Sequence, residues 1–230
     1  MKRSLRWTAG SLCALAFAVS AQADSITVTG NVFSAGTTPG TGGGEFVATL
    51  DGTTTLNVYC IDFSDYFSFN QAYNTIISTP PSLSNTRLGS NIVWEYNLGG
   101  TYDATSRYLM AAHLTTQYAT AGSSTVTNGI QDAIWAMLDV NTNLNLPSNT
   151  AALTEITAAK TWYSGISANP SALTGFESQV RFYTDAGGNN GTLQEFVSVA
   201  PEPSSLLMLL LGTALVCGGM YRKSAKTNRR

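Results

Sequence analysis

Cationic side chains are scarce in the middle of this sequence of 230 residues, and their scarcity argues against one class of function. Eight of the twelve lysines and arginines lie in the two terminal segments. Residues 24–200 contain only four, against thirteen aspartates and glutamates, which gives this part a net charge of −9. A nucleic-acid-binding surface needs a cationic patch to neutralise phosphates. We therefore expect no nucleic-acid partner.

Cysteine and histidine are also scarce. Of three cysteines, Cys13 and Cys217 lie in apolar terminal segments, so Cys60 has no partner for a disulfide within the middle of the chain. Such a cysteine is either a functional or intermolecular thiol or a buried apolar side chain. The single histidine, His113, lies between Ala112 and Leu114, where we expect a packing or surface role. The carboxylates lack calcium-loop spacing, and we expect no metal, no cofactor and no enzyme turnover.

The N-terminus has the three parts of a secretory signal. Lys2, Arg3 and Arg6 precede a short apolar run over residues 12–19, and small residues at positions 21 and 23 precede Asp24. The apolar run is too short to span a bilayer of ~30 Å as a helix. The pattern predicts a signal peptide over residues 1–23 and export of the chain; the alternative is an N-terminal anchor that is never cut.

The C-terminus has three consecutive features. Pro201-Glu202-Pro203 precedes an apolar stretch of 18 residues, 204–221, and five basic residues follow by position 230. The stretch lies at the lower end of the ~17–25 residues that a membrane-spanning helix needs, and the basic end favours a cytoplasmic C-terminus. The tail resembles the PEP-CTERM sorting signal. That resemblance implies recognition by an exosortase in a Gram-negative bacterium, whereas the alternative is an ordinary single-span anchor with a proline-rich stalk.

These signals divide the chain into three parts: a signal peptide (1–23), an extracytoplasmic domain (24–198) and a sorting tail with a transmembrane helix (199–230). The expected location is an inner-membrane-anchored precursor, then the cell surface or the extracellular matrix. The middle part has the size of one ordinary domain, which can bury a core without disulfides.

Within the middle part the pattern is β, then helical, then β. Residues 26–29 and 45–61 read as strands around a hairpin turn at Asp51-Gly52, and residues 63–77 as a further strand pair. Helices are expected from Asp103 or Thr105 to 118 and from Asn149 to 163, with a polar loop at 122–127. Another helix, 130–140, carries an apolar stripe at Ile130, Ala133, Ile134, Met137 and Leu138. This order predicts an α+β fold with an antiparallel β-sandwich or barrel-like core and a helical insertion.

Two short motifs lie 71 residues apart: Tyr59-Cys60-Ile61-Asp62 and Ile130-Gln131-Asp132-Ala133-Ile134-Trp135. Together they resemble the thioester domains of bacterial surface adhesins. In that family a cysteine thiol attacks a glutamine side-chain carbonyl and releases ammonia, leaving an internal thioester. The resemblance implies that Cys60 is the thiol and Gln131 the acyl donor, with Tyr59, Asp62, Ile134 and Trp135 as motif neighbours.

The expected chemistry uses the start of a helix. We expect Gln131 in a first helical turn, where free N–H groups and the helix dipole stabilise a thiolate and an oxyanion. Trp135, one turn later, would cover the bond against water. The alternative is that Gln131 completes a capping box with Asn128.

The implied function is a one-time covalent link to a surface, as in adhesion or matrix attachment. An amine or hydroxyl of a protein or polysaccharide partner would attack at Gln131 and form an amide or an ester. The rival hypothesis is a structural or carbohydrate-associated matrix protein with a free Cys60 and no thioester.

Overall fold

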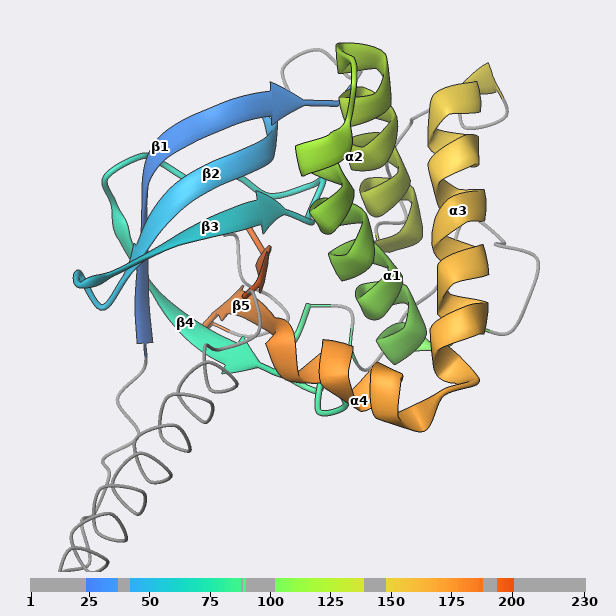
Figure 1. Cartoon of the computed structure of the whole chain (residues 1–230). Helices are drawn as coiled ribbons and strands as arrows, with labels where there is room; N and C mark the ends of the chain where they lie inside the picture. The colour runs from blue at the N-terminus through green and yellow to red at the C-terminus, as the bar shows by residue number, and fades with distance from the viewer. Residues whose placement is uncertain are drawn as a thin grey trace, which may run out of the picture.

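The computed structural model describes residues 24–36, 42–87, 89, 102–138, 148–187 and 194–200. Along these residues four strands precede a group of helices, and two strands follow it (Figure 1). The strands are β1 (Asp24–Ala35), β2 (Gly43–Leu50), β3 (Thr54–Cys60), β4 (Ala72–Ser78), β5 (Val180–Asp185) and β6 (Phe196–Val199). The helices are α1 (Ala104–Gln117), the 3-10 turn η1 (Tyr118–Thr120), α2 (Ser124–Leu138), α3 (Thr150–Ser167) and α4 (Pro170–Gln179).

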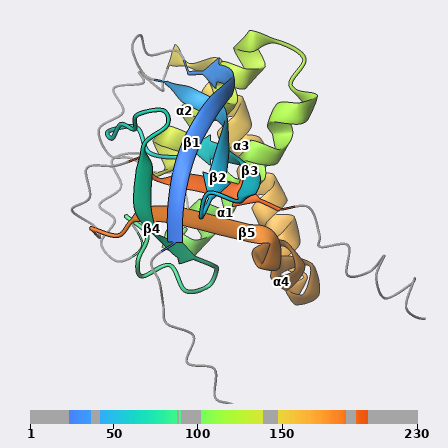
Figure 2. The same cartoon turned by 90° about the vertical axis from the view of Figure 1, so that its left-hand side faces the viewer.

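The strands form a closed antiparallel barrel in the order β1-β2-β3-β6-β5-β4. Figure 2 shows β1 in front with β4 and β2 on its two sides, and the closing strand β6 is paired on both edges, with β3 and β5. The predicted α+β class and the helical insertion are therefore confirmed. Alternate residues of β2 and β3 point into the barrel; on β3 the inward residues are Val58 and Cys60.

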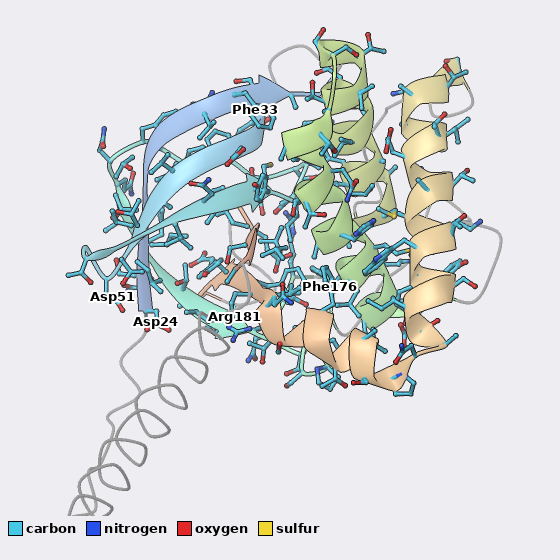
Figure 3. The ribbon with its side chains drawn as sticks, in the orientation of Figure 1. Asp24, Phe33, Asp51, Phe176 and Arg181 are labelled. Atoms are coloured by element: carbon cyan, nitrogen blue, oxygen red, sulfur yellow. The ribbon has the colours of Figure 1, made fainter. Side chains whose placement is uncertain are left out.

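The hairpin between β2 and β3 turns where the sequence predicts. Asp51 and Gly52 both have positive φ, 51° and 67°, and the Thr53 N–H donates to the Leu50 carbonyl at 3.1 Å. Positive φ at both central residues gives the turn the twist of its strands, and Asp-Gly tolerates that conformation best. In Figure 3, Asp51 and Asp24 lie at the barrel end away from the helices, whereas Phe33 lies at the end beside α2.

The predicted strand pair over residues 63–77 is wrong in its first half, because β4 begins only at Ala72. Asn70 adopts a φ of 60° and its N–H donates to the Val28 carbonyl, so the chain turns there instead of extending. The aromatic side chains before it pack against the barrel: Phe67 contacts Phe46 and Phe196 edge-on, with ring centroids 5.0 and 5.3 Å apart. Aromatic packing at one barrel end has replaced strand pairing in this segment.

The helix that carries Gln131 is longer than predicted. It starts at Ser124, where Ser123 accepts hydrogen bonds from the N–H groups of Val126 and Thr127, so the expected polar loop over 122–127 is largely helical. The predicted apolar stripe is confirmed, since Ile130, Ala133, Ile134, Met137 and Leu138 are all buried. The helix is described as far as Leu138, and the predicted end at residue 140 lies outside the described residues.

The other helix starts follow side-chain capping. Asp103 caps α1 through the N–H of Ser106 (2.8 Å), and Asn149 caps α3 through that of Ala152 (3.1 Å), as the sequence indicates. Sequence reasoning missed α4, which Asn169 caps and whose residues are at most half-buried. Its large apolar residues are only Leu173 and Phe176, too few for periodicity to reveal a helix.

His113 has the packing role that was predicted for it. Its ring stacks on Trp162 of α3 with centroids 4.0 Å apart, and Phe176 of α4 lies against Trp162 at 4.9 Å. Burial lowers the pKa of His113 to about 4. The imidazole is therefore neutral near pH 7 and joins α1 to α3.

The two terminal predictions fall on residues that the structure does not describe. The signal peptide (1–23), the sorting motif Pro201-Glu202-Pro203 and the predicted membrane span (204–221) all lie outside the described ranges. Among the helices of the described ranges, none combines the length and the apolar character needed to cross a membrane.

Candidate functional site

Cys60 is the last residue of β3 and points into the protein. Its side chain is buried, with 1 % exposed, and its Sγ–H donates to the main-chain carbonyl of Asp62 at 3.2 Å. Burial raises the pKa of the thiol well above its ordinary value, and the nearby Trp135 side chain opposes that rise. In this environment the neutral thiol is strongly favoured over the thiolate.

Gln131 lies on α2 with its side chain directed at the end of β3, and it is fully buried. Its Nε2 donates to the main-chain carbonyl of Cys60 at 2.9 Å, so the structure brings these two predicted site residues into contact. Its Oε1 accepts two hydrogen bonds, from the Gly44 N–H and the Tyr118 hydroxyl, both at 2.8 Å. The carboxamide is thus held in one orientation by three hydrogen bonds to three different parts of the chain.

The expected position of Gln131 in a first helical turn is wrong, and so is the alternative of a capping box. Because α2 starts at Ser124, Gln131 lies about two turns into the helix, away from the free N–H groups and the dipole of a first turn. Asn128 forms no capping box with it: the Asn128 Oδ1 accepts from the Gly36 N–H at 3.1 Å. The donors to the Gln131 carbonyl come instead from β2 and from the turn after α1, which are remote in sequence.

Glycines at the β1–β2 connection form the near wall of the site. A Cβ on Gly43 would lie 2.5 and 2.6 Å from Cγ and Cδ of Gln131, and one on Gly36, whose φ is +113°, would lie 2.6 Å from the Trp135 ring. A side chain at either position would occupy the space of the amide or the indole. The sequence shows a Gly-rich segment there, but its glycines read only as a loop.

Trp135 is buried one helical turn after Gln131 and packs against Phe63 at a ring-centroid distance of 5.1 Å. Its six-membered ring faces Gly36 and Gly43. Its Nε1–H is a buried donor that has no acceptor with hydrogen-bond geometry among the described residues. Trp135 therefore lies beside Gln131 and brings an unsatisfied donor into the site.

The remaining motif residues surround this pair. Ile134 is fully buried in the core. Tyr59 lies on the other face of β3, half-buried, and stacks on Tyr118 with centroids 5.6 Å apart and rings 9° from parallel. Burial raises the pKa of Tyr118 well above its ordinary value, so its hydroxyl keeps the proton that it donates to Gln131.

A cavity of about 300 Å³ opens beside Cys60 and Trp135. Its walls are mainly aromatic and acidic, from the residues Phe46, Asp62, Phe63, Asp65, Tyr66, Phe67 and Phe69. Tyr66 and Phe69 are largely exposed at 70 % and 48 %, which is unusual for apolar side chains. The cavity gives small molecules a path to the thiol side of the site.

Asp62 is the acidic residue of the first motif and is buried in the cavity wall. Burial raises the pKa of its carboxyl to about 7, although the nearby Arg87 guanidinium lowers it. Its carboxylate accepts from the Ser64 N–H at 2.9 Å and from Arg87, which also pairs with Asp65 at 2.6 Å. Within the described residues, no group of three or more histidine, cysteine or acidic side chains is arranged to hold a metal ion.

No protein-family model matches the sequence, and no curated protein matches it. Among solved structures, the chain is similar to the N-terminal thioester domain of the fibronectin-binding protein SfbI from Streptococcus pyogenes. That comparison has 11 % identity and a TM-score of 0.44, and covers 79 % of this chain and 94 % of the other. The chain is also similar to the N-terminal domain of the S. pyogenes pilus tip adhesin Cpa, with 11 % identity and a TM-score of 0.41. That comparison covers 80 % of this chain and 97 % of the other. At these values neither comparison assigns a function to this chain.

Proposed function

We propose that Cys60 and Gln131 form an internal thioester, and that this bond links the protein once, covalently, to a partner surface. The observation that carries the proposal is the buried carboxamide of Gln131, which donates to the backbone of Cys60 and accepts two hydrogen bonds at Oε1. A glutamine with a merely structural role does not require the only cysteine of the described residues as its neighbour.

The bond forms without a co-reactant. The Cys60 sulfur attacks Cδ of Gln131, a C–S bond forms, the C–N bond breaks, and nitrogen leaves with the thiol proton as ammonia. The tetrahedral intermediate carries negative charge on Oε1. The Gly44 N–H and the Tyr118 hydroxyl already point at that oxygen, as donors of an oxyanion hole must.

An amine suits the cavity better than a hydroxyl. The two carboxylates of Asp62 and Asp65 outnumber the one guanidinium of Arg87 that pairs with them, so ionised carboxylates leave the cavity net negative. Aromatic faces and negative charge attract an alkylammonium group. The carboxyl of Asp62, whose pKa is about 7, is suited to take the proton that an ammonium must lose before it attacks.

The location follows from the two ends of the sequence. The signal over residues 1–23 exports the chain, and Pro201-Glu202-Pro203 with the span 204–221 presents it to an exosortase. The precursor is anchored in the inner membrane of a Gram-negative bacterium, and the processed domain acts at the cell surface or in the matrix. Each molecule reacts once and so is not an enzyme.

Intact mass and amine uptake test the proposal. The full chain should be lighter than its sequence by one ammonia, and methylamine should add at Gln131 while it exposes one thiol at Cys60. Cys60→Ala and Gln131→Ala should each abolish both behaviours, because each removes one half of the bond. Gln71→Ala, at an exposed glutamine, should change neither. If folded protein instead has the full mass of its sequence, with no loss of ammonia, and takes up no amine, the better hypothesis is the matrix protein with a free Cys60.

A further inference from the structure

The sulfur of Cys60 must carry negative charge twice in the proposed chemistry. It attacks Gln131 as a thiolate, and it leaves as a thiolate when an amine opens the thioester. Because the side chain is buried, that charge has no water to solvate it, and burial raises the pKa of the thiol. A donor to the sulfur must therefore come from the protein.

The other polar groups at the site are engaged elsewhere or lower the pKa of Cys60 less than Trp135 does. The Gly44 N–H and the Tyr118 hydroxyl are both engaged at Oε1 of Gln131. The group that contacts the Cys60 sulfur from Asp62 is a main-chain carbonyl, which accepts the thiol proton and has its negative end toward the sulfur. That carbonyl stabilises the thiol, whereas a backbone hydrogen bond of Asp62 lowers the pKa of Cys60 by less than the Trp135 side chain does.

Trp135 has the properties that such a donor needs. Its Nε1–H is buried without an acceptor among the described residues, and its ring lines the same cavity as Cys60. The Gly36 and Gly43 backbone packs on the six-membered ring, which fixes the orientation of the indole. Apart from burial, the strongest influence on the pKa of Cys60 is the nearby Trp135 side chain, which lowers it.

We propose that the Nε1–H of Trp135 is the hydrogen-bond donor to the Cys60 sulfur when that sulfur is negatively charged. This inference rests on the proposed thioester. The sulfur of a neutral thiol or of a thioester is a weak hydrogen-bond acceptor. The Trp135 N–H is therefore poorly satisfied while Cys60 is a thiol or a thioester, and it is satisfied when the thiolate forms. An interaction that is stronger in the charged state than in the resting states lowers the barrier between them.

The opening reaction balances without an added reagent. A primary amine attacks Cδ of Gln131, a C–N bond forms and the C–S bond breaks with its electron pair on sulfur. The resulting thiolate accepts the Trp135 hydrogen bond and then takes the proton that the amine nitrogen loses. The products are a substituted amide at Gln131 and a thiol at Cys60.

The decisive variant removes the N–H and keeps the ring. Trp135→β-(3-benzothienyl)alanine in the full chain puts a sulfur atom in the place of Nε1–H. The same replacement at Trp162, which packs on His113 outside the site, is the matched control. Hydrogen bonds to charged groups are the strong ones, so methylamine should open the Trp135 variant about tenfold more slowly than the parent. The Trp162 variant should stay within about twofold of the parent.

Trp135→Ala distinguishes hydrogen bonding from covering. It removes the N–H and also the ring that excludes water, so the thioester should hydrolyse faster than in the parent. A role limited to covering would instead give the benzothienyl variant the parent's rate of opening, and that result would overturn the inference.

A second measurement separates failure of this inference from failure of the thioester proposal. In a Gln131→Ala background no thioester can form, and Cys60 is a thiol whatever the parent does. Loss of the N–H should lower the rate of iodoacetamide alkylation near pH ~10 by about threefold, because fewer thiolates form while each is more nucleophilic. An unchanged alkylation rate contradicts the Trp135 hydrogen bond, even if the parent protein contains the thioester. A reduced rate supports the contact between Trp135 and Cys60, even if the parent protein contains no thioester.

Discussion

The hydroxyl of Tyr118 donates a 2.8 Å hydrogen bond to Oε1 of Gln131, and the ring that carries it stacks on Tyr59 outside the barrel. This contact joins the turn after α1 to the middle of α2. It places a neutral donor at the oxygen where the tetrahedral intermediate is negative.

Tyr118→Phe should slow thioester formation by about 100-fold, since loss of one oxyanion-hole donor costs ~10²–10³ in rate. The measurement is the loss of one ammonia after dilution from denaturant, followed by intact mass. Tyr59→Phe is the control, because the hydroxyl that donates to Oε1 of Gln131 is that of Tyr118, whereas the Tyr59 hydroxyl lies near the Glu45 carboxylate, which raises its pKa. Equal rates for the two variants would show that Tyr118 has only a packing role.

Gly43→Ala should prevent the thioester and lower the free energy of unfolding by about 1–3 kcal/mol, as overpacking of a core does. Its Cβ would overlap Cδ of Gln131. Gly42→Ala, one residue earlier, meets nothing within 4 Å and should leave mass, amine uptake and stability unchanged. Denaturant unfolding and intact mass of the two variants check this, and normal amine uptake by Gly43→Ala would contradict it.

The pKa of Asp62 predicts how stability changes with pH. The folded value, about 7, lies above the ordinary pKa of 3.8 for an aspartate, so the folded state binds the proton more tightly than the unfolded chain does. The stabilisation is complete below pH ~4 and is lost as the pH rises to ~7, by on the order of 2–4 kcal/mol.

Asp62→Asn should remove this part of the pH dependence. Burial also raises the pKa of Glu195, so the test is the difference between parent and variant in denaturant unfolding from pH 4 to 8. Arg87 keeps Asp65 as a partner in the variant. Parallel curves for the two proteins would mean that Asp62 is ionised throughout this range.

The sorting tail gives a prediction in cells. A chain that ends at Val199 should appear in soluble form in the periplasm or medium, because it lacks the predicted span 204–221. In a strain without the exosortase, the full chain should accumulate as an uncut, membrane-bound precursor. Detection of Arg229 and Arg230 on mature surface protein by mass spectrometry would rule out processing near Pro201-Glu202-Pro203.

The sequence predicts those parts of the fold that depend on local pattern. Alternation gave β2 and β3, Asp51-Gly52 gave the turn between them, and apolar spacing gave the buried face of α2. The start of α2 was misplaced because Ser123 begins a helix that is polar for its first turn. An apolar stripe identifies the buried part of a helix and not its first residue.

For the site, the sequence identifies Cys60, Gln131 and Trp135 but not the groups that act on them. The Gly44 N–H and the Tyr118 hydroxyl reach Gln131 only because the barrel and the helices pack together, and neither belongs to either motif. Position 43 has no room for a side chain because the Gln131 side chain packs against it. No rule based on neighbouring residues in the sequence predicts this contact. Such contacts depend on tertiary packing, and they cannot be predicted from local patterns in a single sequence.

The position of β6 has a mechanical consequence. This strand ends one residue before Ala200 and is hydrogen-bonded to β3 on one edge and β5 on the other. A force applied at the C-terminal end of β6 therefore acts on its pairings with both β3 and β5. Of these two strands, β3 ends at Cys60. If the far end is held through Gln131, tension runs from α2 across the barrel to β6. Detaching β6 requires its pairings with both neighbours to break, so the attachment should hold longer under load than a strand paired on one edge would allow.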